Sequence, residues 1–267
     1  MSVCVKNSTL AVLFFNLDLL KQQLVTITHI MRVTGNQKLS ISGYKLLFGT
    51  FLGPFIQCLL FFSAARSIGV LRVWFFLIFS EVMMFGGLVV VSVMNPELIN
   101  QRGKWRKIKD TKKWDRMITP FFGIFGYYVV MYVSGLDVGR NHSAHLGIVF
   151  FILGVTGYIF GTALLYWAMI VNRHFEVTVR IQNDRNHTVI SDGPYTIVRH
   201  PGYVGAILFT LSTPFIVGSA WGVIPAVIAV LFLVLRTWLE DKTLCKELDG
   251  YKYYSKRTKY RLLPWIW

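Results

Sequence analysis

The chain has 267 residues, of which 54% are hydrophobic and 15% charged, and its mean hydropathy is +0.51. This composition is too apolar for a soluble domain of this length and indicates a polytopic membrane protein. The net charge of +15 suggests nucleic acid at first, but no recognition motif accompanies it and the basic residues cluster beside apolar spans. Nucleic acid binding is therefore excluded. Cys4, Cys58 and Cys245 show no paired spacing, which argues against a disulfide framework and a cysteine-ligated metal.

Residues 1–45 are mixed in character and are predicted to form an N-terminal extension outside the bilayer or at its surface, without a signal peptide. Apolar runs over about 46–64 and 73–94 predict the first two spans, and Pro96 ends the second. The segment 101–116 then carries eight Lys and Arg residues against two acids, which places this loop in the cytoplasm.

Two further spans are predicted over about 117–136 and 146–171, so residues 46–171 would hold transmembrane helices 1–4. His142 and His145 lie between them without a third ligand, and we predict no metal site. The fourth span has small residues at helical spacing, which favour close intramolecular helix contact over dimerisation. These are Gly154, Gly157 and Gly161.

The last third of the chain contains a hydrophobic hairpin over 204–235, and each arm contains a proline, Pro214 or Pro225. Proline-interrupted short segments often mark a binding site in membrane proteins, while kinked packing is the alternative. The predicted fold is all-α: a polytopic membrane bundle of about six transmembrane helices, the last two a hairpin, with a cytoplasmic C-terminal region. Both termini would be cytoplasmic.

Ionisable and aromatic residues gather on both sides of this hairpin, where lipid makes unpaired polar groups costly. They are Arg180, Gln182, His187, Tyr195, Arg199, His200, Tyr203, Arg236, Glu240 and Asp241. A helix that begins at Pro201, beside Arg199 and His200, favours an anion. Taken singly, these residues also fit snorkelling anchors, interfacial tyrosines and a weak surface ion pair.

Arg236 and Glu240 are spaced i,i+4 and would share a helix face. Glu240 is suited to a cationic group and Arg236 to a carboxylate or phosphate. Tyr195 and Tyr203 are suited to a cation through their ring faces, an attraction of about 0.5–2 kcal/mol.

An ordered set of motifs over about 175–267 resembles the membrane-embedded methyltransferases that include isoprenylcysteine carboxyl methyltransferase and the phospholipid N-methyltransferases. The motifs are Gly193-Pro-Tyr195, Arg199-His-Pro-Gly-Tyr203-Val-Gly205, Arg236-Thr-Trp-Leu-Glu240-Asp241, Leu244, Tyr251-x-x-Tyr254 and Tyr260-Arg-Leu-Leu-Pro264. Asn95-Pro-Glu-Leu98 and Lys112-Lys-Trp-Asp115 also look like the wider family. The resemblance implies that residues 172–267 form the cofactor-binding and catalytic region.

The resemblance also implies S-adenosylmethionine as the cofactor, and Arg236 as the catalytic residue that holds the methyl acceptor. By the same resemblance, the cofactor would be bound by Gln182, His187, Thr188, Val189, Ile190, Tyr195, His200, Pro201, Gly202, Tyr203 and Glu240. The acidic run after Arg236 is reduced to Glu240 and Asp241, and the stretch from Gln182 to His187 is shorter than in the eukaryotic enzymes; both departures concern the acceptor more than the donor.

We therefore expect a multi-pass membrane methyltransferase that acts on a lipophilic or prenylated acceptor at the cytoplasmic leaflet, with carboxyl O-methylation favoured. An ionised carboxylate suits Arg236, whereas an amine would have to lose a proton beside a guanidinium. Phospholipid N-methylation or another small-lipid methylation stays open as an alternative reaction. Two alternatives from other classes are a small-anion transporter and a non-enzymatic scaffold. A transporter would need charges in the middle of its spans, such as Glu81. The sequence does not fix the oligomeric state.

Overall fold

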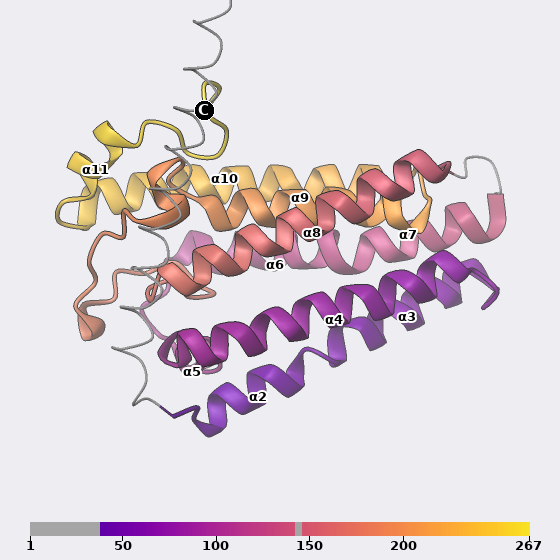
Figure 1. Cartoon of the computed structure of the whole chain (residues 1–267), viewed down its shortest axis with the longest axis horizontal. Helices are drawn as coiled ribbons and strands as arrows, with labels where there is room; N and C mark the ends of the chain where they lie inside the picture. Colours follow the sequence, from indigo (N-terminus) through magenta and orange to yellow (C-terminus); the bar gives the residue numbers. More distant parts are fainter. Residues whose placement is uncertain (1–37, 142–145) are drawn as a thin grey trace, which may run out of the picture. The chain divides into compact units, whose positions relative to one another are not determined.

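The computed structural model describes residues 38–141 and 146–267, and Leu39–Trp267 forms one compact unit. Every regular element within these ranges is helical, which confirms the predicted all-α class (Figure 1). Within the described residues, five helical stretches are long and apolar enough to cross a membrane: Ile41–Ala65, Leu71–Met94, Lys113–Arg140, Ile148–Val171 and Val223–Glu247. Most of the predicted N-terminal extension, and His142 and His145, lie outside the described residues.

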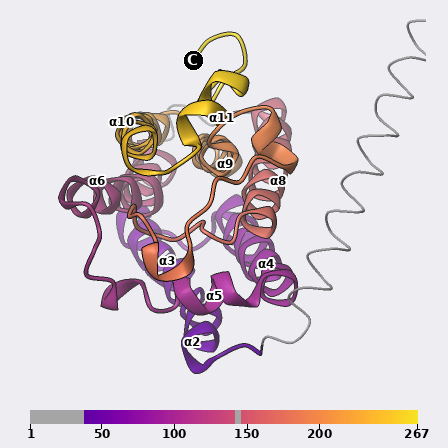
Figure 2. The ribbon, with the colours of Figure 1, turned by 90° about the vertical axis from the view of Figure 1, so that its left-hand side faces the viewer.

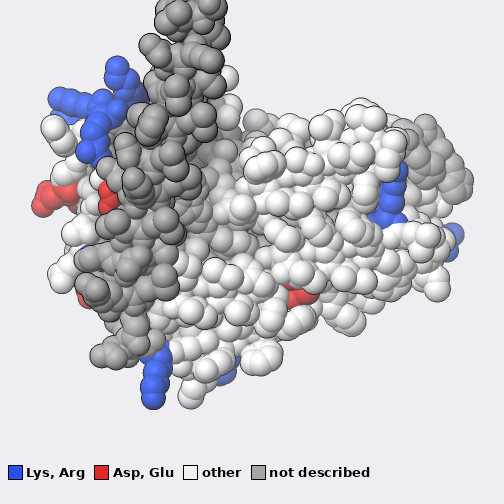
Figure 3. Space-filling model, viewed as in Figure 1, with Lys and Arg blue, Asp and Glu red and all other residues white. Residues whose placement is uncertain are grey.

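The fifth of the six predicted crossings corresponds to α9, Pro201–Val217, which has 17 residues and is not among these five stretches. At 1.5 Å per residue it is about 25 Å long, shorter than the roughly 30 Å hydrocarbon core. Figure 3 shows a broad face of the described bundle that is almost free of charge, with basic and acidic side chains concentrated toward its ends. This distribution is typical of a helix bundle whose sides face lipid.

The first predicted span, 46–64, starts earlier than expected and is broken. It consists of α2 (Ile41–Gly49) and α3 (Leu52–Ala65), separated at Thr50 and Phe51. Pro54 explains the break, because its ring clashes with the carbonyl of residue 50 and its nitrogen has no hydrogen to donate. The Thr50 hydroxyl donates to the carbonyl of Leu47 at 2.6 Å and so closes the last turn of α2. Helix α4 (Leu71–Met94) matches the second predicted span closely.

The third span starts before the predicted residue 117, because α6 (Lys113–Gly123) begins within the basic loop. It continues through the π-helical turn η2 (Ile124–Val129), then α7 (Val130–Leu136), and ends in a second π-helical turn, η3 (Asp137–Asn141). Between α4 and α6 lie α5 (Pro96–Arg102) and the short 3-10 turn η1 (Trp105–Lys107). Asn95 caps α5, since its side chain accepts a hydrogen bond from the backbone of Leu98.

Helix α8 (Ile148–Val171) packs directly on α9 through its glycines. A Cβ atom on Gly161 would lie 2.7 Å from the carbonyl oxygen of Gly205, and one on Gly154 would lie 2.9 Å from the backbone nitrogen of Ile216. A Cβ on Gly157 would meet the Ser212 hydroxyl at 2.5 Å. The predicted intramolecular role of these small residues is confirmed.

The hairpin turns at Gly218, whose φ of +92° suits glycine, and α10 then runs from Val223 to Glu247. The predicted apolar arm ended at residue 235, and the helix continues beyond it through polar residues to Glu247, so Arg236 and Glu240 lie on one helix as predicted. Pro225 lies in the first turn of α10, where a missing N–H is tolerated, so it does not interrupt this arm. Pro214 lies inside α9.

The chain between α8 and α9 crosses one end of the bundle, beside the C-terminal helix α11 (Tyr251–Arg257), as Figure 2 shows. It contains two short 3-10 turns, η4 (Asn183–Arg185) and η5 (Gly193–Thr196). This crossing brings residues 172–200 against the first turn of α9 and the second half of α10. The candidate site lies there.

Candidate functional site

Two adjoining cavities lie at this end of the bundle and share six lining residues: Asn172, Phe175, His187, Tyr203, Glu240 and Leu244. The first, which we call the tyrosine cavity, is also lined by Thr188, Val189, Ile190, Tyr195, Arg199, His200, Leu248, Tyr251 and Tyr254. The second, which we call the arginine cavity, is also lined by His174, Glu176, Thr178, Val179, Arg180, Gln182 and Arg236. Two stretches remote in sequence, 182–203 and 236–240, therefore face one site.

Glu240 is the residue that connects the two stretches. Its Oε2 accepts a hydrogen bond from the Tyr203 hydroxyl at 2.5 Å. The Tyr203 ring in turn stacks on the His200 ring, with centroids 5.6 Å apart and planes within 10°. A carboxylate, a phenol and an imidazole are thus held together on the wall of the tyrosine cavity.

Tyr195 is buried in the tyrosine cavity and is fixed from two sides. Its hydroxyl accepts a hydrogen bond from the Asn172 amide at 3.0 Å, and its carbonyl accepts one from the Tyr254 hydroxyl at 2.7 Å. Burial raises the pKa of Tyr195 well above its usual value, so its ring is neutral at physiological pH. The site therefore presents a rigid, uncharged aromatic face.

His187 contributes a neutral imidazole to both cavities. Burial, together with nearby His174 and arginine side chains, lowers the pKa of His187 to about 4. Its Nδ1 accepts a hydrogen bond from the backbone of Gln182 at 3.3 Å, which requires an unprotonated nitrogen. Thr188, Val189 and Ile190 follow it along the wall of the tyrosine cavity.

Gln182 is buried and its amide is already engaged. Its Nε2 donates to the carbonyl of His174 at 2.7 Å, and its Oε1 lies 3.1 Å from the Nδ1 of His174 and accepts from Arg185 at 2.8 Å. Gln182 therefore stabilises the conformation of residues 172–200, and it also lines the arginine cavity.

Pro201 and Gly202, both predicted to contact the cofactor, lie in the first turn of α9 and line neither cavity. A Cβ on Gly202 would approach Phe175 to 2.5 Å, so the glycine allows the Phe175 ring to pack against α9. Pro201 begins the helix, as predicted, and His200 precedes it in a non-helical conformation.

Arg236 lies on α10 one turn before Glu240 and faces the arginine cavity. Its Nε donates to the Asp115 carboxylate at 2.8 Å, and its Nη2 donates to the carbonyl of Val177 at 2.7 Å. Its guanidinium carbon is 5.2 Å from the centre of the Tyr203 ring. Asp115 is fully buried, so the pair is a buried ion pair that also fixes the direction of the guanidinium.

The pairing of Asp115 with Arg236 was missed by sequence reasoning, because 121 positions separate the two residues. The only signal in the sequence was that Asp115 belongs to the Lys112-Lys-Trp-Asp115 motif, which looks like the wider family.

Arg199 is not available to an outside anion, contrary to the expectation from its place before α9. Its Nε and Nη2 donate to Asp241 at 2.7 and 2.9 Å, and its Nη1 donates to the carbonyls of Thr258 and Lys259. Asp241 also accepts from Arg261 and from the Tyr251 hydroxyl. This cluster joins the start of α9, α10, α11 and the C-terminal segment, and two of its members, Arg199 and Tyr251, line the tyrosine cavity.

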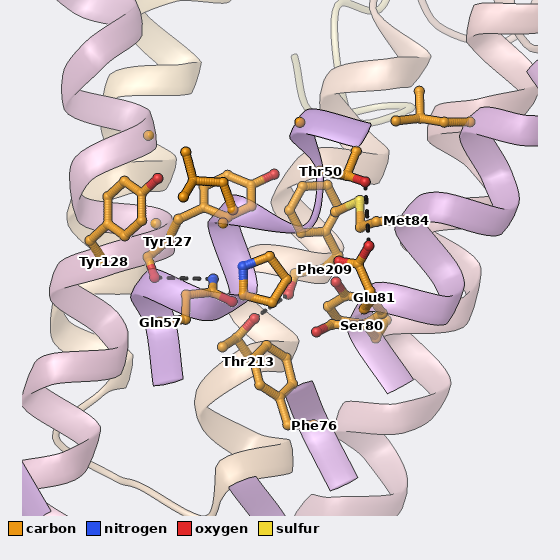
Figure 4. A pocket seen from close by; sticks show the side chains of 18 residues that line it. Thr50, Gln57, Phe76, Ser80, Glu81, Met84, Tyr127, Tyr128, Phe209 and Thr213 are labelled. Carbon is orange, nitrogen blue, oxygen red and sulfur yellow. Dashed lines mark hydrogen bonds between the residues drawn. The ribbon is translucent and has the colours of Figure 1, made fainter. Parts of the chain in front are cut away.

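A third cavity of about 390 Å³ lies between the predicted spans and is shown in Figure 4. Its walls are largely apolar, with Phe76, Met84, Tyr127 and Phe209 among them. Glu81 also lines it and accepts a hydrogen bond from Thr50 at 3.3 Å. Its volume falls in the range of small-molecule sites, which is roughly 300–1,000 Å³.

Residues 152–246 match the family described as "Isoprenylcysteine carboxyl methyltransferase (ICMT) family", and every predicted site residue falls within this segment. The chain is also 30% identical over 108 residues to "Protein-S-isoprenylcysteine O-methyltransferase B" of Arabidopsis thaliana. That similarity covers 39% of this chain and 54% of the relative, so the chain spans about half the length of the relative it matches. The predicted resemblance to the ICMT family is confirmed for this part of the chain.

Proposed function

From the match of α8, α9 and α10 to the ICMT family, we propose that this protein transfers a methyl group from S-adenosylmethionine to a lipophilic acceptor in the membrane. Carboxyl O-methylation of a prenylated cysteine is the favoured reaction. The observation that carries the proposal is the meeting of Glu240 with Tyr203, His200 and Tyr195 on one cavity wall.

The chemistry of the tyrosine cavity fits the proposed donor. The donor carries an ammonium, a sulfonium and an adenine, for which a carboxylate and flat aromatic faces are suitable partners. Glu240 is the carboxylate that lines this cavity in the described chain, and one of its oxygens is already oriented by Tyr203. Tyr195, Tyr203 and His200 supply the rings, and neutral His187 adds no positive charge that would repel a sulfonium.

The bound donor would supply an activated methyl group, so the protein needs mainly to align two reactants and exclude water. Tyr203 and Asn172 orient the residues that would hold the donor. The ion-pair cluster around Asp241 fixes Arg199 and Tyr251 on the wall of the tyrosine cavity. An acceptor carboxylate is ionised at neutral pH, and no strong general base is required of the chain.

Arg236 would hold the acceptor's head group in the arginine cavity, next to Glu240 and Tyr203. Its Nε and Nη2 are fixed by Asp115 and Val177, so the remaining edge of the guanidinium has a set direction. The apolar cavity of Figure 4 lies within the spans and is suited to a lipophilic chain. These features support an acceptor that is polar at one end and apolar at the other.

The cytoplasmic face is our proposal for the side on which the site opens. The basic segment 101–116 and the basic C-terminal tail lie at the same end of the described bundle as the site (Figure 2). Loops rich in Lys and Arg stay on the cytoplasmic side.

The test is transfer of a radiolabelled methyl group from S-adenosylmethionine to total membrane extract, with and without the purified protein. Base-labile label on protein would support carboxyl methylation, and base-stable label on lipid would favour phospholipid N-methylation instead. Absence of any label, together with no thermal shift by S-adenosylhomocysteine, would contradict the proposed enzyme and favour a transporter or scaffold.

A further inference from the structure

Glu81 is an ionisable residue that the proposed methyl transfer does not use. Helix α4 runs from Leu71 to Met94, which places Glu81 near the middle of a span, at the depth of the bilayer core. It lines the third cavity, whose other walls are largely apolar (Figure 4). A carboxyl group at this depth is costly, so an ionisable residue there indicates a function.

The protein satisfies the Glu81 carboxyl only weakly. Its Oε1 accepts a hydrogen bond from the Thr50 hydroxyl at 3.3 Å, but the shorter hydrogen bond of that hydroxyl, at 2.6 Å, goes to the carbonyl of Leu47. Within residues 38–141 and 146–267, its Oε2 makes no hydrogen bond and is not one of the enclosed unpartnered atoms, so it is accessible at the cavity wall. No basic side chain in these ranges lies within ion-pair distance of Glu81.

Two interruptions of regular α-helix meet at this cavity. One is the break between α2 and α3, where Gly49, Thr50 and Pro54 line the cavity. The other is the π-helical turn η2, where Tyr127 and Tyr128 line it. Irregular backbone at membrane depth is tolerated where it lines a cavity, and π-helical turns are frequent at functional sites. The two interruptions therefore favour a binding site over a packing defect.

The other polar groups on the walls mainly offer acceptors to a ligand. The hydroxyls of Ser80 and Thr213 already donate to backbone carbonyls of their own helices, at 3.2 and 3.1 Å. Gln57 donates to the carbonyl of Tyr127 at 3.2 Å, and its amide oxygen makes no hydrogen bond within the described ranges. Together with Glu81, these groups favour a ligand that donates hydrogen bonds. Aromatic rings on the walls add faces that attract a cation. They belong to Phe76, Tyr127, Tyr158 and Phe209.

We propose that this cavity binds a lipophilic amine, whose ammonium group pairs with Glu81 and whose apolar body fills the space between the spans. A hydrocarbon chain alone would leave Glu81 unpaired, and an acid would bring a second negative charge beside it. An amine also forms the pair with a protonated Glu81, because it takes up the carboxyl proton.

This inference goes beyond the proposed function and does not depend on a methyl donor. Its charge preference is opposite to that of the arginine cavity, where Arg236 favours an anion. Under the proposed function, a lipophilic amine would compete with the apolar chain of the acceptor for the space beside Glu81.

The experiment compares three probes of equal chain length, decylamine, decan-1-ol and decanoic acid, by isothermal titration at neutral pH. The full-length protein is held in phosphatidylcholine nanodiscs, and titrations into empty nanodiscs are subtracted because all three probes enter lipid. Wild type is expected to bind the amine about tenfold or more tightly than the alcohol, and the acid more weakly than the alcohol. In Glu81→Gln the preference for the amine should fall to about twofold or less, while the affinity for the alcohol is retained.

Two glycine variants test whether the probes bind in this cavity. Gly53 lines the cavity and a Cβ there meets nothing within 4 Å, so the side chain of Gly53→Leu occupies part of the space and should weaken all three probes. Gly86→Leu is the matched control, because a Cβ on Gly86 also meets nothing within 4 Å but Gly86 does not line the cavity. It should bind the probes as wild type does.

An amine-to-alcohol ratio in Glu81→Gln equal to that of wild type would overturn the inference, as would wild-type affinities in Gly53→Leu. Equal binding of amine and alcohol by wild type would overturn the choice of an amine. The ratio is the readout, since a merely structural defect in Glu81→Gln would weaken amine and alcohol together. Failure of the proposed function would show separately, as a wild-type protein that does not bind S-adenosylhomocysteine.

Discussion

Arg236 illustrates how one side chain combines a structural and a proposed functional role. It compensates the charge of the fully buried Asp115, and it faces the arginine cavity beside Tyr203. Removal of one partner of such a pair leaves a buried charge and costs about 3–5 kcal/mol. A loss of activity in a single variant would therefore mix unfolding with a direct effect.

We predict that Arg236→Gln impairs use of the acceptor and retains the affinity for S-adenosylhomocysteine within about twofold, provided that it folds. The double variant Arg236→Gln/Asp115→Asn removes both charges and should recover most of the thermal stability, because no buried ion is left unpaired. It should not recover methyl transfer. Full activity in the double variant would contradict the role of Arg236 in acceptor binding.

His187 gives the site a pH dependence whose sign follows from its lowered pKa. The pKa is about 4 in the folded chain against an ordinary value of 6.5, so the unfolded chain takes up the proton first as pH falls. The stabilising contribution of neutral His187 is complete above about pH 6.5 and declines as pH falls toward 4.

Thermal unfolding measured between pH 7.5 and 5 checks this contribution. The melting temperature of wild type should fall as the pH is lowered through this window. The melting temperature of His187→Gln should fall less steeply, because Gln does not titrate. Parallel pH profiles for the two proteins would show that His187 does not titrate as inferred.

Among the elements, the contact between α8 and α9 positions the site, because it fixes the first turn of α9, from which Tyr203 donates to Glu240 and stacks on His200. The contact depends on glycine, since a Cβ on Gly161 would lie 2.7 Å from the carbonyl oxygen of Gly205 and 2.8 Å from the nitrogen of Phe209. Backbone atoms cannot move aside as a flexible side chain can, so both helices would have to shift.

We predict that Gly161→Ala destabilises the protein by about 1–3 kcal/mol, the usual cost of overpacking. Gly86→Ala on α4 is the matched control, because a Cβ there meets nothing within 4 Å and alanine favours a helix by up to about 1 kcal/mol. Thermal unfolding in one detergent measures both. Equal melting temperatures for Gly161→Ala and wild type would refute the close-contact interpretation.

At the scale of the whole molecule, the sequence predicted the helical class and the approximate place of each span, because long apolar runs are a direct signal of lipid-facing helices. It did not predict where α10 ends. The apolar run ends at residue 235 and the spacing of Arg236 and Glu240 predicted one helix face there, yet backbone hydrogen bonds carry the helix further through polar residues, to Glu247. The break at Thr50 was also missed, although Pro54 was visible.

The site was predicted less completely than the fold. The clustering of polar and aromatic residues beside the hairpin and the resemblance to the membrane methyltransferases pointed to Tyr195, Tyr203 and Glu240, which the structure brings to one cavity. Ion pairs between remote positions, such as Asp115 with Arg236 and Arg199 with Asp241, leave no local pattern in a single sequence. For the same reason the cavity of Figure 4, which several separate helices line, was not anticipated.

Isothermal titration of S-adenosylhomocysteine into wild type and Glu240→Gln tests most directly whether residues 182–203 and 236–241 form a methyl-donor site. Glu247→Gln, another glutamate on α10 whose partner is Lys112 at the surface, is the control. We predict binding to wild type and to Glu247→Gln, and an affinity at least about tenfold weaker in Glu240→Gln, because a charge-assisted hydrogen bond is lost. Unchanged affinity in Glu240→Gln, or no binding to wild type, would contradict this account.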